Sequence, residues 1–226
     1  MKAVVFDFNG TLYNDTRFHI AAWTNFFRRR GIEMSETEVR AKCIGPGNID
    51  IFRAHLSPDL SMNEMKRLSE DKEREYRAVA GSKEEYRALV PGTEDMLNAL
   101  KAREIPFALA TASPIENVEF YLNTLGLNRW FSLKNVVYDD DTLACKPAPD
   151  FYLEAMRRLG VSPEETVIVE DSVTGLLSAR NAKAGRIVMR DETVSVDFLN
   201  AQADIYAIIH DFTNFDSFLG DLKMKG

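Results

Sequence analysis

The sequence predicts an α/β protein with a mostly parallel sheet and a second, all-helical domain inserted near the start of the chain. Short runs rich in Val, Ile and Phe, typical of buried strands, alternate with longer patterns of helical period. This alternation indicates a parallel sheet with helices on both faces. One long stretch after the first run contains helical patterns and no convincing strand. We therefore expect a Rossmann-like, doubly wound core with a helical cap domain inserted into it.

Six apolar runs are expected to form the strands of the core. Each is too short for a helix, and the first ends at the turn signal Asn9-Gly10-Thr11. In chain order the runs are 3–8, 106–111, 135–138, 166–169, 186–189 and 205–209.

Four helical patterns lie between these runs, at 93–103, 114–125, 150–159 and 173–182. Two segments combine an N-cap serine, a proline at the first helical position and a glutamate at the third. They are Ser113-Pro114-Ile115-Glu116 and Ser162-Pro163-Glu164-Glu165. Both segments are predicted to begin helices.

The inserted helical domain is expected to cover residues 15–86, with the core formed by 1–14 and 87–226. Five residues at helical spacing mark the buried face of its first helix: Phe18, Ala22, Trp23, Phe26 and Phe27. Two capping boxes are expected to start further helices, and their residues are Ser35 with Glu38 and Ser61 with Glu64. The charge-dense run 64–77 is predicted to be a solvated helix face.

The composition argues against several classes of protein. The 226 residues are 45% hydrophobic and 28% charged, and the formal net charge of −7 disfavours binding to nucleic acid or to anionic membranes. No window approaches the roughly 20 apolar residues that span a bilayer. Cys43 and Cys145 are far apart, so neither zinc nor a disulfide framework is expected. We expect a cytoplasmic protein that is a monomer or a weak dimer.

Polar residues follow several predicted strands at the point where each strand ends. They are Asp7, Thr111 and the pair Glu170-Asp171, while Lys146 lies in a loop that precedes a helix. Ligands of open parallel sheets bind beyond the carboxyl ends of the strands. Carboxylates suit a hard cation such as Mg²⁺, and a lysine with a hydroxyl suits phosphate. These residues therefore predict a site for Mg²⁺ and a phosphate group.

Four segments resemble motifs of the haloacid dehalogenase-like (HAD) superfamily, in its phosphatase and β-phosphoglucomutase branch with a helical cap. The segments are Asp7-Phe8-Asn9-Gly10-Thr11, Ala110-Thr111-Ala112-Ser113, Lys146-Pro147-Ala148-Pro149-Asp150 and Val169-Glu170-Asp171-Ser172-x-x-Gly175. They occur in the order of the family and extend over roughly the first 190 residues.

The resemblance implies a nucleophile and a metal site. Asp7 would attack phosphorus, form an aspartyl-phosphate and bind Mg²⁺. Asp171 would be the second metal carboxylate, with Glu170 a nearby contributor. The backbone carbonyl of Asn9 would be a further metal ligand.

The resemblance also implies a phosphate site. Thr111, the amide of Ala112, and Gly10 would hold the phosphate oxygens. Lys146 would neutralise charge between the nucleophile and the phosphoryl group. Ser113 lies in the same segment and is a further candidate for phosphate binding, although we assign it mainly to capping the following helix.

Asn9 departs from the family pattern, which has an aspartate as general acid and base at this position. Its amide neither donates a proton to a leaving alkoxide nor takes one from water, a function typically worth about 10²–10⁴-fold in rate. The chain is then an impaired variant, or it uses a substrate with a good leaving group such as an acyl phosphate or pyrophosphate. Alternatively, His19 at the start of the cap substitutes as the acid, although it could equally be a hydrogen-bonded linker residue.

A fourth explanation is a different reaction. Metal-independent dehalogenases also lack this aspartate, but the Glu170-Asp171 pair argues for a metal. Phosphonate hydrolases need a cap lysine, and the aligned position in this chain is Asn48, while Lys42 aligns poorly. Asn48 and His19 are the candidate substrate-binding residues of the cap. Gly45-Pro46-Gly47 is expected to form the substrate-facing loop of the cap.

The function we expect is that of a Mg²⁺-dependent phosphatase for a small phosphorylated metabolite, with a sugar phosphate as the leading candidate. A β-phosphoglucomutase-like mutase and a catalytically impaired phosphometabolite-binding protein are the alternatives. The cap would exclude water and select the substrate.

Overall fold

The computed structural model describes residues 1–44, 47–220 and 222. The chain divides into two compact units, Met1–Asn14 with Ala88–Gly226, and Asp15–Arg87. The boundary lies one residue after the expected one, because Arg87 belongs to the helical unit.

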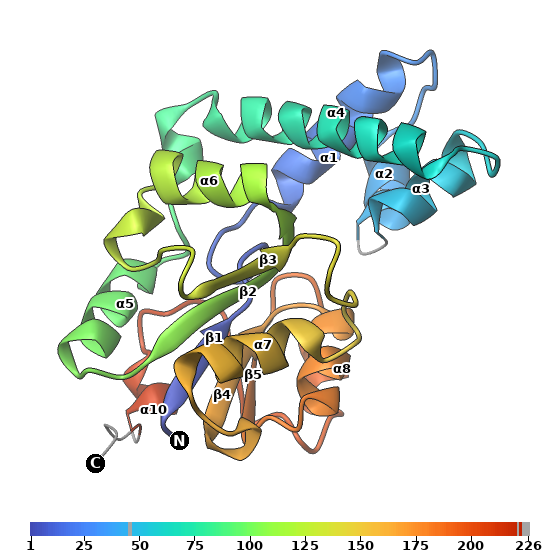
Figure 1. Ribbon diagram of the computed structural model, residues 1–226. Helices are drawn as coiled ribbons and strands as arrows, with labels where there is room; N and C mark the ends of the chain where they lie inside the picture. Colours follow the sequence, from blue (N-terminus) through green and yellow to red (C-terminus); the bar gives the residue numbers. More distant parts are fainter. Residues whose placement is uncertain (45–46, 221, 223–226) are drawn as a thin grey trace. The chain divides into compact units, whose positions relative to one another are not determined.

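The first unit contains a six-stranded parallel sheet in the order β3-β2-β1-β4-β5-β6 (Figure 1). Its strands are β1 (Ala3–Phe6), β2 (Phe107–Pro114), β3 (Val136–Asp139), β4 (Thr166–Glu170), β5 (Arg186–Arg190) and β6 (Ala207–Ile209). The predicted fold class is confirmed, and every predicted strand lies within a few residues of an observed one. The chain leaves β1 toward β2 on one side and later reaches β4 on the other, so β1 marks the switch point of the sheet.

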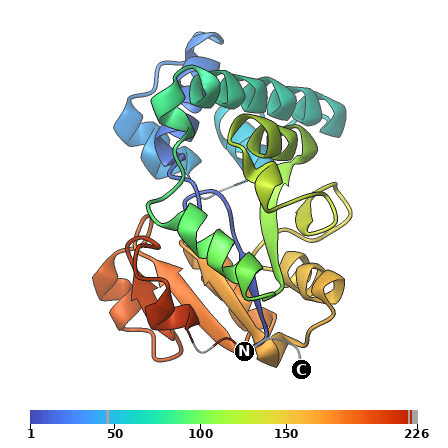
Figure 2. The same cartoon turned by 90° about the vertical axis from the view of Figure 1, so that its left-hand side faces the viewer.

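Helices cover both faces of this sheet. The helices are α5 (Thr93–Ala102), α6 (Ile115–Thr124), α7 (Asp150–Leu159), α8 (Val173–Asn181), α9 (Val196–Asn200) and α10 (Asp216–Leu219). α7 and α8 pack on one face, where Phe151 and Leu176 join a buried cluster with Val5 and Ile168. Figure 2 shows α5 on the opposite face.

The two serine-proline segments of the core do not begin helices in the predicted way. β2 continues through Pro114, so Ser113 still belongs to the strand and makes no cap hydrogen bond to α6. Ser162 precedes only a short 3₁₀ turn, Pro163–Glu165, because the chain enters β4 at the next residue. The helix predicted at 114–125 is confirmed as α6, but without its serine cap, whereas the segment that begins at Ser162 forms only a 3₁₀ turn because the sheet resumes there.

The helical unit consists of α1 (Thr16–Arg28), α2 (Glu36–Cys43), α3 (Asn48–His55), α4 (Met62–Gly81) and the 3₁₀ turn Glu84–Arg87. The predicted apolar face of α1 is buried, and both predicted capping boxes are present at Ser35 and Ser61. None of the helices in the described part of the chain is long and apolar enough to cross a membrane. Of the predicted substrate-facing loop, residues 45 and 46 lie outside the described residues, and Gly47 is the N-cap of α3.

The charge-dense helix α4 is not a fully solvated face, which corrects the prediction for 64–77. Lys72 and Glu73 are only 2% and 6% exposed. The Lys72 ammonium lies 2.9 Å from Glu73 Oε1 and 2.8 Å from His19 Nδ1, and Asn48 Nδ2 donates to Glu73 Oε1 at 2.9 Å. Two charges can be buried here because each has a partner of opposite charge and further hydrogen bonds.

Both ring nitrogens of His19 face polar residues of the helical unit. Lys72 donates to Nδ1, so Nε2 carries the proton and faces Asp15 Oδ2 at 3.4 Å. Asp15 also accepts a hydrogen bond of 2.6 Å from the Tyr76 hydroxyl, and the His19 ring stacks on Tyr76 at 4.1 Å. His19 is thus built into a buried polar network of the helical unit.

We expect Glu73→Gln to lower the free energy of unfolding by about 3 kcal/mol at pH 7, because it leaves the Lys72 ammonium buried without a counter-ion. Burial disfavours the charged form of Glu73, but the charge of Lys72 and the hydrogen bonds from Asn48 and Lys72 outweigh it and lower the pKa of this carboxyl from 4.5 to about 2. The stabilisation is therefore fully present above pH 4.5 and is lost as the pH falls toward 2.

Urea unfolding followed by Trp23 fluorescence measures this difference at pH 7 and at lower pH. Glu70→Gln, at an exposed position of the same helix, is the control and should change stability by less than about 0.5 kcal/mol. A Glu73→Gln variant as stable as this control would contradict the expected role of the buried pair.

Candidate active site

Asp7 lies directly after the central strand β1, at its carboxyl end. Its backbone N–H donates to the carbonyl of Val169 at 2.9 Å, which ties it to the neighbouring strand β4. The residue is 8% exposed, and its Oδ1 accepts a hydrogen bond of 2.7 Å from the Lys146 ammonium. The sheet thus presents one carboxylate, held by a cation, at the switch point.

Three buried carboxylates meet at this point. Oxygen atoms of Asp7, Glu170 and Asp171 all lie within 4.8 Å of one another. Burial, together with the charges of Glu170 and Asp7, raises the pKa of Asp171 well above its usual range. Three ionised carboxylates at this spacing need more positive charge than one lysine supplies. The donor set consists of oxygen atoms only and fits a hard divalent cation.

Lys146 is the resident cation of the cluster. Its ammonium donates to Asp7 Oδ1 at 2.7 Å, to Glu170 Oε1 at 2.6 Å and to the Tyr152 hydroxyl at 2.9 Å. Burial alone would lower the pKa of Lys146, but the charges of Asp7 and Glu170 raise it above its usual value. Each of the three ammonium protons therefore has an acceptor.

Glu170 is oriented by the two residues that precede α8. Its Oε2 accepts from the backbone N–H of Asp171 at 2.9 Å and from the N–H and hydroxyl of Ser172, both at 3.1 Å. A Cβ at Gly175 would lie 1.8 Å from the Glu170 carboxyl carbon, so only glycine allows this approach. Glu170 Oε1 accepts from Lys146 and from Tyr152 at 2.6 Å.

Gly10 makes the turn after Asp7 possible. Its φ of +78° lies in the left-handed region, and an added Cβ would lie 2.2 Å from Asp171 Oδ2. Asp171 Oδ1 accepts from the Thr11 hydroxyl at 3.1 Å. The buried guanidinium of Arg190 donates to the Gly10 carbonyl and, at 2.8 Å, to the carbonyl of His210. Arg190 thereby fastens the turn to the end of β5.

A second group of polar side chains surrounds Asn9. Its Oδ1 accepts from the Thr111 hydroxyl at 3.1 Å and from the Ser113 hydroxyl at 2.9 Å. Its Nδ2 donates to the hydroxyl of Tyr121 on α6 at 2.9 Å. Ser113, which we predicted mainly as a helix cap and also as a candidate phosphate-binding residue, therefore lies at the site and contacts Asn9.

The structure brings together most of the predicted site residues in the first unit: Asp7, Asn9, Gly10, Thr111, Ser113, Lys146, Glu170 and Asp171. Ala112 lies between two of them with an exposed side chain. His19 and Asn48 belong to the helical unit, where both are hydrogen-bonded to residues of that unit.

Three residues of the site were not found by sequence reasoning: Tyr121, Tyr152 and Arg190. Each is a polar side chain on a buried position of a helix or strand. Only that combination, a tyrosine or arginine where the apolar pattern calls for a buried residue, could have indicated them.

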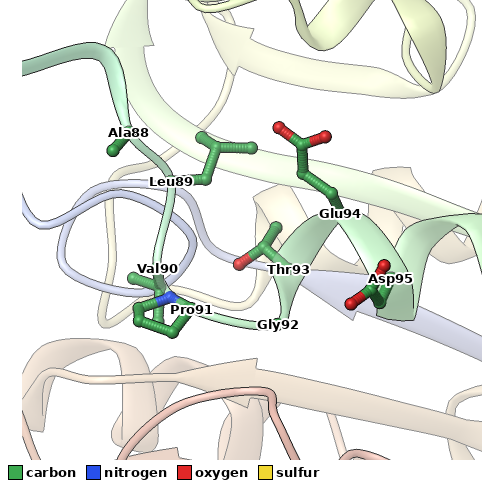
Figure 3. Close-up of a pocket in the computed structure, with 8 residues that line it drawn as sticks. All are labelled: Ala88, Leu89, Val90, Pro91, Gly92, Thr93, Glu94 and Asp95. Carbon is green, nitrogen blue, oxygen red and sulfur yellow. The ribbon is translucent and has the colours of Figure 1, made fainter. Parts of the chain in front are cut away.

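A hollow of about 240 Å³ lies along 88–95 in the same unit, around the start of α5 (Figure 3). Its lining includes the acidic residues Glu94 and Asp95 and none of the predicted site residues. No residue of the carboxylate cluster lines this hollow.

The chain belongs to the haloacid dehalogenase-like hydrolases, whose family model matches residues 1–183. A phosphorylated carbohydrates phosphatase from Thermotoga maritima is 30% identical over 191 residues, which cover 83% of this chain and 84% of the relative. The match places the chain among the phosphatases of the family and confirms the predicted class of enzyme. Members of the family generally use a divalent metal, which agrees with the donor set around Asp7.

Solved structures give the same result for the fold. A HAD hydrolase of family IA, variant 3, from Entamoeba histolytica superposes with a TM-score of 0.87 and 34% identity, covering 94% of each chain. A mutant of CbbY from Rhodobacter sphaeroides, in complex with xylulose-1,5-bisphosphate, has a TM-score of 0.78 and 26% identity over 95% of this chain and 96% of CbbY.

We expect Asp171→Asn to weaken Mg²⁺ binding by more than about tenfold, because loss of even an outer hydrogen bond at a metal site costs that much. Isothermal titration calorimetry with Mg²⁺ alone measures the affinity. Asp197→Asn, at an exposed position of α9, removes the same charge away from the cluster and should bind like the wild type. Equal affinities for the wild type and Asp171→Asn would contradict the assignment of Asp171 as a ligand.

Proposed function

We propose that the chain is a Mg²⁺-dependent phosphatase for small phosphorylated metabolites and works through an aspartyl-phosphate on Asp7. The observation that carries this proposal is the Asp7 carboxylate at the switch point, 2.7 Å from the Lys146 ammonium and within a cluster of three buried carboxylates. Nucleophile, counter-ion and metal-binding oxygens converge there from three separate parts of the chain.

Asp7 is suited to nucleophilic attack without a base. An ordinary aspartate has a pKa of about 3.9 and is ionised at neutral pH. Its oxygen bonds to phosphorus while the bond from phosphorus to the leaving oxygen breaks. Negative charge on the transferred group is spread over its equatorial oxygens, so catalysis depends mainly on positioning and on positive charge. Lys146 supplies positive charge, and Thr111, Gly10 and the N–H of Ala112 hold the oxygens.

The metal would be held by Asp7 and Asp171 and by the backbone carbonyl of Asn9, with Glu170 close by. When bound, Mg²⁺ would offset the charge of the carboxylates and of the phosphoryl group. The all-oxygen donor set favours Mg²⁺ over softer metals.

Phosphorylated sugars are the first substrates to consider. The Thermotoga relative is a phosphatase of phosphorylated carbohydrates, and CbbY was crystallised with xylulose-1,5-bisphosphate. Asn9 favours a second candidate, a protein that binds such compounds and turns them over slowly, because an amide at this position performs no general acid–base catalysis.

We expect purified protein with Mg²⁺ to release phosphate from at least one member of a panel of sugar phosphates, acyl phosphates and pyrophosphate. Asp7→Ala removes the nucleophile and should lower the rate by at least about 10³-fold. Asp197→Ala is the matched control and should leave the rate unchanged. Phosphate release that persists in Asp7→Ala would contradict the covalent route, and its absence with every compound would contradict the phosphatase.

We expect His19→Ala to lose less than about threefold in kcat, far below the 10²–10⁴-fold of a general acid, because His19 is held by Lys72 and Asp15. The measurement is steady-state phosphate release from the best compound of the panel. A loss of 10²-fold or more with an intact fold by circular dichroism would instead identify His19 as the substitute acid.

A further inference from the structure

We infer, building on the proposed function, that Asp7 is phosphorylated efficiently only by donors whose leaving group departs as a weakly basic anion, namely acyl phosphates and phosphoanhydrides. Alkyl phosphate esters, including most sugar phosphates, are then poor donors. The inference rests on a ring of hydrogen bonds through Asn9, Ser113 and Tyr121, which fits a neutral side chain at position 9.

The ring consists of three contacts of equal length. Asn9 Nδ2 donates to the Tyr121 hydroxyl at 2.9 Å, and the Ser113 hydroxyl donates to Asn9 Oδ1 at 2.9 Å. The Ser113 and Tyr121 hydroxyls lie 2.9 Å apart. Since the single proton of Ser113 is directed at Asn9, the proton in the third contact comes from Tyr121. Each side chain thus donates once and accepts once around the ring.

The ring and Thr111 contact both ends of the Asn9 amide. The hydroxyl of Thr111 also donates to Oδ1, at 3.1 Å, so the oxygen end of the amide faces two donors. Tyr121 and Ser113 are 1% and 8% exposed, and hydrogen bonds in such surroundings are strengthened by the low local dielectric. The Asn9 side chain is therefore held in place by neighbours from β2 and α6.

An ionised carboxylate would not fit the same ring. It only accepts hydrogen bonds, so both ring hydroxyls would point at it and their contact of 2.9 Å would lack a proton. It would also add a negative charge two residues from Asp7, beside the carboxylate cluster. The neighbours of position 9 thus suit a neutral amide, and both ends of the Asn9 side chain have hydrogen-bond partners.

With a neutral amide at position 9, phosphoryl donors fall into two groups, according to whether the leaving group needs a proton. When Asp7 attacks an acyl phosphate, the phosphorus–oxygen bond breaks, the electron pair stays on the leaving carboxylate, and no proton moves. A phosphoanhydride releases a phosphate anion in the same way. An alkyl ester must expel an alkoxide, and without a general acid this step loses about 10²–10⁴-fold in rate.

The second step is affected as well. Water bonds to phosphorus, the bond between phosphorus and Asp7 breaks, and Asp7 recovers its carboxylate, while the proton of water must pass to solvent or to the released phosphate. Asn9 does not accept this proton. Phosphorylated Asp7 therefore accumulates during turnover.

The test compares two donors on the wild-type protein with Mg²⁺: acetyl phosphate and glucose 6-phosphate at equal concentration. Intact-mass spectrometry and peptide mapping follow phosphorylation of Asp7, and a colorimetric assay follows phosphate release. We expect acetyl phosphate to label Asp7 and glucose 6-phosphate to leave it unlabelled over the same time. Asn9→Asp should raise phosphate release from glucose 6-phosphate by about 10²–10⁴-fold and shorten the lifetime of the label.

The control is Asn200→Asp, which makes the same change at an exposed position of α9 and should alter neither donor. The inference is overturned if the wild type is labelled as fast by glucose 6-phosphate as by acetyl phosphate, or if Asn9→Asp brings no gain with the ester. Failure of the proposed function has a different signature: neither donor labels Asp7 or yields phosphate in the wild type or in Asn9→Asp.

The ring itself has a readout that needs no turnover. In protein with ¹⁵N-labelled asparagine, Tyr121→Phe removes one acceptor, so the side-chain amide protons of Asn9 should exchange with solvent at least about tenfold faster. Tyr206→Phe changes an exposed tyrosine, 47% accessible, and should leave this exchange unchanged. Unchanged exchange in Tyr121→Phe would show that Tyr121 does not hold Asn9, which would remove the basis of the inference.

Discussion

The interaction on which the site depends is the balance of charge between one buried ammonium and three buried carboxylates. Lys146 donates to Asp7 and Glu170 at 2.7 and 2.6 Å, yet the cluster with Asp171 still carries an excess of negative charge. Buried charges of one sign repel each other strongly unless a cation lies among them. This excess of negative charge favours a divalent metal among the three carboxylates, and in the proposed function the added positive charge would keep Asp7 ionised as the nucleophile.

The site contains two separate groups of residues, one charged and one neutral. The carboxylates and Lys146 surround Asp7, whereas Asn9 belongs to a neutral ring with Ser113 and Tyr121. The first group has the features that phosphoryl transfer requires, namely a nucleophile, counter-ions and oxygen donors for a metal. The second group is matched to an amide that moves no proton. If Asp7 attacks phosphorus as proposed, turnover would depend on the identity of the leaving group rather than on the ability to attack.

Much of the fold and the main site residues could be predicted because they follow from local patterns. A short apolar run followed by a polar residue indicates the carboxyl end of a strand, and parallel strands bring such ends to one edge. This reasoning selected Asp7, Thr111 and Asp171. It ranked Ser113 mainly as a helix cap, since a serine before a proline signals a cap equally well. It failed for Lys72, since charged residues on a helix are usually solvated.

The sequence by itself determined the α/β architecture, the helical insertion and the polar strand ends, because hydrophobic periodicity and turn residues act over a few neighbouring positions. Only the tertiary structure decided which polar groups meet. Lys146 reaches Asp7 across 139 residues and Tyr121 reaches Asn9 across 112. A buried tyrosine satisfies the apolar pattern as well as a phenylalanine does, so its hydroxyl acquires a role only when folding places a partner within hydrogen-bond distance.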